Sequence, residues 1–226
     1  MDIQKPALRD AAAVIFDVDG TLVDSVDFHA EAWRRTFAEF GRDIDFEAIR
    51  SQIGKGGDQL LPVFLDPEEI EREGEKLEAH RSDLFKRDYL PKVQGFPGVR
   101  ELFDALIARG VVVALGSSAK GEELETYKKA AGIDDLDLVE VTSEDAERTK
   151  PHPDIFTVAV AKTGVPAART IVVGDSPYDA EAAGKAGVRA IGLLCGGFDE
   201  ATLREAGAIQ IYRDPSELAA AMREAG

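Results

Sequence analysis

"AAAVIFDVDGTLVDS", residues 11–25, is an apolar run that ends abruptly at two aspartates one residue apart. The run has the length and composition of a buried β-strand, with Asp17 and Asp19 at its carboxyl end. Because residues two apart on a strand project to the same face, the two carboxylates are expected to be neighbours. A strand that ends in an Asx-Gly turn is common, so the motif alone leaves a purely structural role open.

Five further short apolar or β-branched runs follow, each bounded by Gly, Asp or Pro, with helical patterns between them. Together with the first run they predict strands at residues 11–17, 111–116, 136–141, 170–174, 189–194 and 208–212. Helices are expected over 99–109, over 120–131, from Pro153 and from Pro177 or Tyr178. Buried strands alternating with helices indicate an α/β fold, a doubly wound parallel sheet covered on both faces.

Residues 26–95 break this alternation. They show no convincing strand but two long helical patterns, one through Phe28, Trp33 and Phe37 and one over residues 67–88. The stretch "VQGFPGV" then marks a boundary rich in Gly and Pro. The sequence therefore predicts a core made of residues 1–25 and 96–226, with an α-helical unit inserted at 26–95.

Composition narrows the classes of partner. The formal net charge of −16 argues against nucleic acid, which needs clustered Lys and Arg, and no apolar run approaches the roughly 20 residues of a membrane span. Cys195 is the only cysteine, so no internal disulfide can form and a reducing, cytoplasmic location is expected. We expect a monomer or a weak dimer that acts on a small metabolite.

Polar residues follow other predicted strands as well. Ser117 follows the second strand, and Asp175 and Asp179 follow the fourth. Ligands of open α/β sheets bind beyond the carboxyl ends of the strands, so these side chains should meet Asp17 and Asp19. Each pair of carboxylates at about 4 Å repels by roughly 4 kcal/mol at an effective dielectric constant near 20. A hard divalent cation is therefore expected, and all-oxygen ligands favour Mg²⁺.

The motifs "DVDGT", Ser117, "KPHPDIF" and "GDSPYDAEAA", in that order, resemble the haloacid dehalogenase (HAD) superfamily of phosphohydrolases. The similarity spans essentially the whole chain and is strongest to the branch of phosphoglycolate phosphatases, sugar-phosphate phosphatases and β-phosphoglucomutases. It implies a Rossmann-like core with an α-helical cap after the first strand. It also implies that Asp17 is a nucleophile that forms an aspartyl phosphate and that Asp19 is the general acid and base.

The same resemblance implies roles for the remaining residues. Asp17 and Asp175 would bind Mg²⁺ through their side chains and Asp19 through its backbone carbonyl, while Ser117 and Lys150 would bind the phosphoryl oxygens. Asp179 would act through water or by holding Lys150. The segment around Lys150, taken alone, favours an exposed lysine ahead of a helix over a residue of the site. Because an unperturbed Asp has a pKa of about 3.9, the site should raise the pKa of Asp19.

Three residues of the insertion are candidate substrate contacts. Lys55 lies in the glycine-rich "QIGKGGDQLL", which lacks the Walker-A spacing and is either a flexible loop or, as the resemblance implies, a loop that dips into the site. His29 and Trp33 lie one helical turn apart, with Trp33 expected in the core and His29 toward the cleft. Arg81, on the second long helix, is a weaker candidate.

The expected function is a Mg²⁺-dependent phosphatase for a small phosphomonoester, phosphoglycolate-like or sugar-phosphate-like. A β-phosphoglucomutase-like mutase would use the same motifs and stays an alternative. Phosphonate cleavage fits less well because that branch replaces Asp19 by Ala. A receiver domain draws its acidic residues from different strands and lacks a long helical insertion, and a non-catalytic protein would have no need of the intact motifs.

Overall fold

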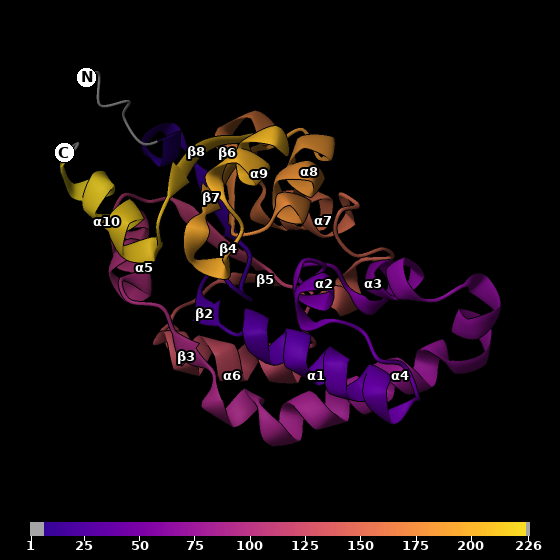
Figure 1. Cartoon of the computed structure of the whole chain (residues 1–226). Helices are drawn as coiled ribbons and strands as arrows, with labels where there is room; N and C mark the ends of the chain where they lie inside the picture. Colours follow the sequence, from indigo (N-terminus) through magenta and orange to yellow (C-terminus); the bar gives the residue numbers. More distant parts are fainter. Residues whose placement is uncertain (1–6, 225–226) are drawn as a thin grey trace.

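A central parallel sheet organises the chain, whose computed structural model describes residues 7–224. The strands are β1 (Ala13–Phe16), β4 (Val112–Gly116), β5 (Val139–Val141), β6 (Thr170–Gly174), β7 (Arg189–Leu193) and β8 (Ala208–Tyr212). They lie in the order β5-β4-β1-β6-β7-β8, and all pairs are parallel (Figure 1). Since chain order reverses across β1, the switch point where α/β sheets bind ligands lies at its carboxyl end.

Helices cover both faces of this sheet, as the uninterrupted apolar strands predict. One apolar cluster joins Val14 and Phe16 of β1 to α5 (Val99–Ile107), α6 (Gly121–Ala131) and α10 (Pro215–Glu224). A second joins Ile15, on the other face, to helices α7 (Asp154–Thr163), α8 (Pro177–Lys185) and α9 (Glu200–Glu205). The predicted doubly wound α/β core is confirmed.

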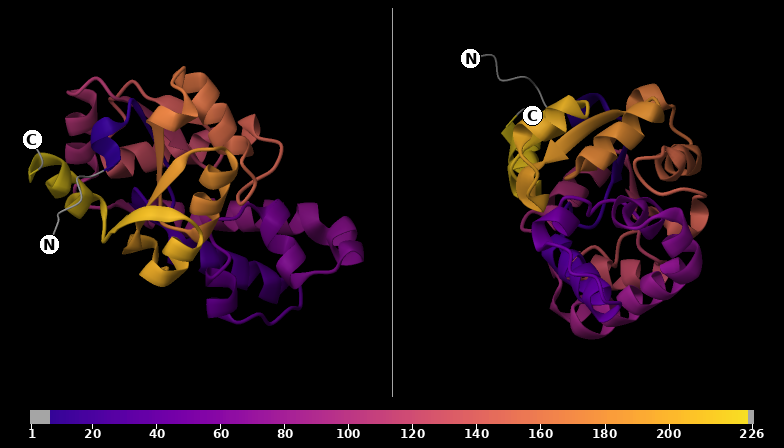
Figure 2. Two further views of the ribbon diagram at one scale, coloured as in Figure 1. Left: turned by 90° about the horizontal axis from the view of Figure 1, so that it is seen from above. Right: turned by 45° about the vertical axis from the view of Figure 1, so that its right-hand side comes forward.

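The segment between β2 and β3 is helical. It contains α1 (Val26–Glu39), α2 (Phe46–Arg50), α3 (Gly57–Phe64) and α4 (Pro67–Asp88), which we call the helical unit. Its own apolar cluster includes Trp33, Phe37, Leu60 and Leu77. In Figures 1 and 2 the unit lies to one side of the sheet. The two long helices match their sequence patterns; α2 and α3 were not foreseen, because five and eight residues show little periodicity.

The two connections between sheet and helical unit run side by side. β2 (Val23–Asp24) pairs antiparallel with β3 (Gln94–Gly95). The expectation of no strand within residues 26–95 is therefore wrong at its last two positions. A strand of two residues has no readable alternation, and it exists here because it pairs with a partner 70 residues away in the sequence.

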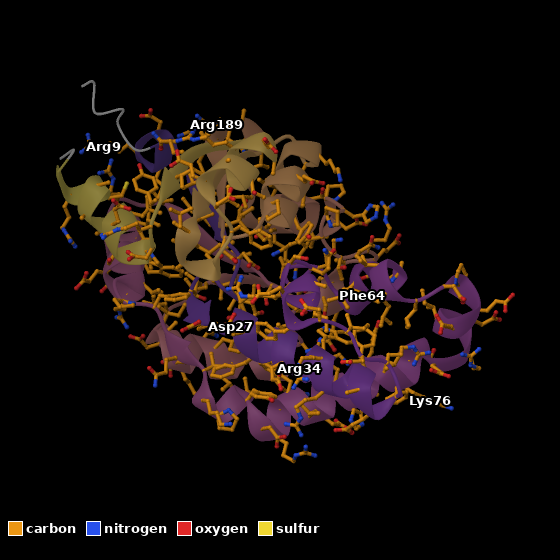
Figure 3. The ribbon with its side chains drawn as sticks, viewed as in Figure 1. Arg9, Asp27, Arg34, Phe64, Lys76 and Arg189 are labelled. Atoms are coloured by element: carbon orange, nitrogen blue, oxygen red, sulfur yellow. The ribbon has the colours of Figure 1, made fainter. Side chains whose placement is uncertain are left out.

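The remaining regular structure consists of short 3₁₀ turns at Ala7–Asp10, Leu90–Lys92, Ser143–Asp145, Ala167–Arg169 and Leu194–Gly196. Figure 3 places charged side chains such as Asp27, Lys76 and Arg189 on the outer surface, where all three are exposed. Among the described residues, we find no helix that is both long and apolar enough to cross a bilayer.

Candidate active site

Four ionisable side chains meet at the carboxyl ends of β1 and β6. Asp17 directly follows β1 and Asp175 directly follows β6, and oxygens of Asp17, Asp175 and Asp179 lie within 4.8 Å of one another. The Lys150 ammonium forms an ion pair with Asp17 and lies 2.7 Å from Asp179 Oδ1. All four side chains are buried, so the Asp–Lys cluster encloses three carboxylates against one ammonium.

Local sequence fixes Asp175 and Asp179 in this cluster. Thr21 Oγ1 donates a hydrogen bond to Asp175 Oδ1 at 2.9 Å. Ser176 caps the start of α8, and its hydroxyl donates to Asp179 Oδ2 at 2.6 Å, so the capping box that begins the helix also orients Asp179. A Cβ added at Gly196 would lie 1.7 Å from Asp175 Oδ2, which leaves glycine as the residue that fits there.

Burial makes the negative charge of this cluster expensive. Burial, together with the carboxylates of Asp179 and Asp19, raises the pKa of Asp17 to about 7 against the opposing effect of Lys150. Burial and the carboxylates of Asp179 and Asp17 raise the pKa of Asp175 well above its usual range. On Lys150 burial opposes the charge, but Asp17 and Asp179 outweigh it and raise the pKa. A buried surplus of oxygen-borne negative charge fits a hard divalent cation.

Asp19 faces the helical unit rather than the cluster. Its Oδ1 lies 2.9 Å from His29 Nε2 and accepts a hydrogen bond from Ser25 Oγ at 2.6 Å. Burial would raise the pKa of Asp19, but the charge and hydrogen bond of His29, with the hydroxyl of Ser25, outweigh it and lower the pKa. The expected upward shift of the Asp19 pKa is therefore wrong for this arrangement, because His29 of the insertion and Ser25, just before it, stabilise the carboxylate.

The expectation that Asp17 and Asp19 project to one face because both lie on the first strand is wrong. β1 ends at Phe16, and Asp19 lies in the following turn, where it forms an isolated bridge with Val23. The two carboxylates still line one cavity, since the turn returns Asp19 to the same edge of the sheet.

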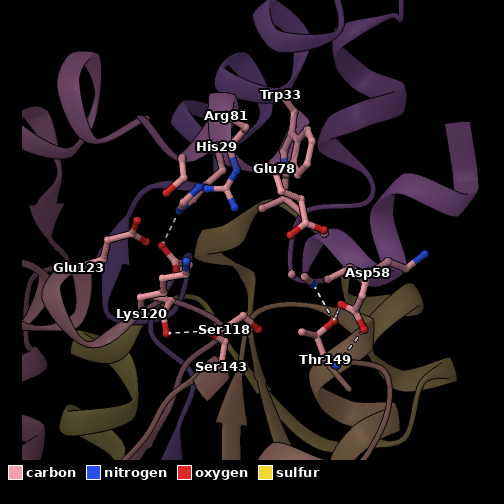
Figure 4. A pocket seen from close by; sticks show the side chains of 18 of the residues that line it. His29, Trp33, Asp58, Glu78, Arg81, Ser118, Lys120, Glu123, Ser143 and Thr149 are labelled. Carbon is pink, nitrogen blue, oxygen red and sulfur yellow. Dashed lines mark hydrogen bonds and ion pairs between the residues drawn. The ribbon is translucent and has the colours of Figure 1, made fainter. Parts of the chain in front are cut away.

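That cavity, of about 470 Å³, lies between the sheet edge and the helical unit. Figure 4 shows Trp33, His29 and Arg81 on one side of it and Ser118 and Thr149 opposite. The cavity is thus built from both parts of the chain, and its size is within the range of small-molecule sites.

All three candidate residues of the insertion line the cavity. His29 Nε2 lies 3.2 Å from Tyr127 Oη in addition to its contact with Asp19. Lys55 Nζ donates to Gln52 Oε1 at 2.6 Å and lies over the ring of Tyr178. The Arg81 guanidinium lies 5.2 Å from the centroid of Trp33, which is 3% exposed and packed in the core of the unit as expected.

Around Ser117 the structure adds residues that sequence reasoning missed. Ser117 is fully buried, and its Oγ accepts a hydrogen bond from the Ala119 amide at 3.0 Å. Its neighbours Ser118 and Lys120 line the cavity, and within the described chain Ser118 Oγ has no hydrogen-bond partner. The signal was present in "LGSSAK", which offers two hydroxyls and a cation directly after a strand.

A parallel sheet with a helical insertion and a buried Asp–Lys cluster at its carboxyl edge defines a class of hydrolases. Residues 14–193 match the haloacid dehalogenase-like hydrolase family, and the chain belongs to it. The chain is 27% identical to a phosphorylated carbohydrates phosphatase of Thermotoga maritima, over 94% of this chain and 98% of that protein. It is 34% identical to the phosphoglycolate phosphatase of Pseudomonas savastanoi pv. phaseolicola, over 81% and 69%. The crystal structure of a hydrolase from Pseudomonas syringae, 29% identical, superposes with a TM-score of 0.85 over 94% and 98%.

Proposed function

We propose that this hydrolase is a Mg²⁺-dependent phosphatase that cleaves a small phosphomonoester through an aspartyl phosphate. The observation that carries the proposal is the Asp–Lys cluster, in which Asp17 also lines the cavity. A carboxylate beside a buried ammonium, at the wall of a cavity of suitable size, is positioned to attack a phosphoryl group.

In the proposed reaction, a carboxylate oxygen of Asp17 attacks phosphorus while the bond from phosphorus to the leaving oxygen breaks. Asp19 gives that oxygen a proton. Water then attacks phosphorus, Asp19 takes its proton, and the bond to Asp17 breaks, which releases phosphate. Asp19 must therefore bind a proton before the first step, although its contacts with His29 and Ser25 favour the ionised carboxylate.

Mg²⁺ would be held by the side chains of Asp17 and Asp175 and by the backbone carbonyl of Asp19, and when bound it supplies neutralisation of the phosphoryl charge. Lys150 and Ser117 bind the phosphoryl oxygens in this scheme. Asp179 holds the Lys150 ammonium, consistent with their 2.7 Å separation.

The cavity favours a leaving group with several hydroxyls. Arg81 and Lys120 offer donors, and Glu75, Glu78 and Glu147 offer acceptors, on the walls above Asp17. A hydroxyl can bond to both kinds of partner, whereas an ionised carboxylate only accepts hydrogen bonds and cannot bond to the Glu side chains. We therefore place sugar-phosphate-like esters ahead of phosphoglycolate, with the helical unit as the cap that closes over them.

The deciding experiment is a screen of some tens of phosphorylated metabolites with millimolar Mg²⁺, scored both for free phosphate and for isomerised product. Release of phosphate that EDTA abolishes supports the proposal. Isomerised product without phosphate would identify a mutase instead. Turnover that EDTA leaves unchanged would remove the metal from the mechanism.

A further inference from the structure

The glycine-rich segment of the helical unit, residues 51–58, contacts two parts of the core that carry site residues, the loop before Lys150 and the first turn of α8. Tyr178 Oη, one residue before Asp179, donates a hydrogen bond to the Ser51 carbonyl at 2.6 Å. At the other end of the segment, Gly56 and Asp58 bond to Thr149, which directly precedes Lys150.

Thr149 is held by three hydrogen bonds from the helical unit, drawn as dashed lines in Figure 4. The Gly56 amide donates to Thr149 Oγ1 at 3.0 Å. The Thr149 amide donates to Asp58 Oδ2 at 3.2 Å, and its hydroxyl donates to Asp58 Oδ1. The hydroxyl therefore both accepts and donates, and one carboxylate binds two donors of the same residue.

The glycines of the segment allow this approach. A Cβ at Gly56 would lie 2.3 Å from Thr149 Cγ2, and a Cβ at Gly54 would lie 2.8 Å from Ser176 Oγ. The segment is thus not simply a flexible loop between helices. It fits closely against the loop that carries Lys150 and against the start of α8, which carries Asp179.

We propose that Asp58 and Thr149 are positioning residues, through which closure of the helical unit sets the place of Lys150. The inference rests on the proposed function. Lys150 Nζ must reach both Asp17 and Asp179 from the residue after Thr149, so fixing the amide of Thr149 fixes the start of that side chain. When the helical unit moves away, this amide and hydroxyl lose three hydrogen bonds, and Lys150 is held only by its ion pairs with Asp17 and Asp179.

The test compares Thr149→Val and Asp58→Ala with two controls. Thr149→Ser keeps the hydroxyl, and Glu68→Ala removes an exposed acid from the first turn of α4, as Asp58→Ala does from that of α3. Thr149→Val and Asp58→Ala should each lower kcat by about 10-fold or more, as loss of hydrogen bonds to a charged group predicts, with little change in KM. The double variant should lose no more than the worse single variant. Both controls should stay within about threefold of the parent protein.

Two measurements do not depend on turnover. The affinity for inorganic phosphate with Mg²⁺, which reports where Lys150 lies, should fall by about 10-fold in Thr149→Val but not in Thr149→Ser. The Gly56 amide should exchange its hydrogen faster in Thr149→Val, because its acceptor is gone.

Unchanged phosphate affinity, unchanged exchange at Gly56, or additive losses in the double variant would each overturn the positioning role. If the parent protein hydrolyses no ester while phosphate affinity and exchange respond as expected, the proposed function fails and the positioning contact stands. Failure of the two proposals is therefore distinguishable.

Discussion

Asp17 is the residue on which the proposed chemistry depends most directly. Asp17→Asn replaces the attacking carboxylate by an amide, which is not a nucleophile, so phosphate release should fall by about three orders of magnitude or more. The substitution is isosteric and removes a buried charge, and the unfolding temperature without metal should not fall. The measurement is the initial rate of phosphate release at saturating Mg²⁺. A rate near that of the parent protein would rule out Asp17 as the nucleophile.

The role of Asp19 as general acid is tested by comparing esters with different leaving groups. If it protonates the leaving oxygen, Asp19→Asn should slow hydrolysis of an alkyl or sugar phosphate by about 100-fold or more. The first step with p-nitrophenyl phosphate, whose leaving group needs no proton, should be slowed far less by the same substitution. Rates for the two esters, measured under single-turnover conditions, give the comparison. Equal losses would place the acid elsewhere.

At the scale of elements, the turn after β7 is predicted to shape the metal site. Gly196→Ala would push a methyl group into Asp175, whereas Gly184→Ala, within α8, meets nothing within 4 Å. Gly196→Ala should therefore raise the Mg²⁺ concentration for half-maximal activity by about 10-fold or more, since a displaced ligand weakens the site. Gly184→Ala should leave it unchanged and slightly stabilise the helix. Similar Mg²⁺ requirements of the two variants would contradict this role for Gly196.

The helices and strands that were predicted well from the sequence contain local patterns that indicate their structure. β6 is a run of apolar residues between turns, and α4 begins where Asp66, Pro67 and Glu69 form a capping box. β3 has no such signal and forms through its pairing with β2, while α2 has an N-cap at Asp45 but is too short to show periodicity. Local patterns are equally limited for the site. The predicted strand ends were enough to place Asp17 and Asp175, but no local pattern shows that His29 and Ser25 stabilise the Asp19 carboxylate. Contacts between segments therefore decided the sign of its pKa shift.

At the scale of the whole molecule, an excess of acidic residues coexists with a site for an anionic substrate. The chain carries 43 acidic and 27 basic residues, yet cations line the cavity at Lys55, Arg81 and Lys120. The helical unit contributes two of these cations and the core contributes Lys120. A favourable environment for a phosphate ester therefore requires both parts of the chain together, as expected if closure precedes chemistry.

We expect the Asp–Lys cluster to make global stability depend on pH and on metal. The pKa of Asp17 is raised to about 7 and that of Asp175 well above its usual range, chiefly by burial, so between about pH 4 and 7 these two groups bind more protons in the folded state than in the unfolded state. Without metal, this contribution to stability is present below about pH 4 and is lost as pH rises toward 7 and above. Relative to Asp175→Asn, which removes one of these acids, the metal-free protein should become less stable between pH 5 and pH 8.

Metal should reverse that loss, because a divalent cation favours the ionised carboxylates. At pH 8, Mg²⁺ at 100 times its Kd should stabilise the fold by about 2.7 kcal/mol, which for a chain of this length raises Tm by about 5–10 °C. Asp175→Asn should show little of this shift, and Ca²⁺-free and Mg²⁺-free buffers with EDTA provide the baseline. Thermal unfolding at pH 5, 6, 7 and 8, with and without Mg²⁺, measures both effects. An equal Mg²⁺ shift in Asp175→Asn, or parent stability that rises with pH relative to that variant, would mean that these carboxylates do not form the metal site.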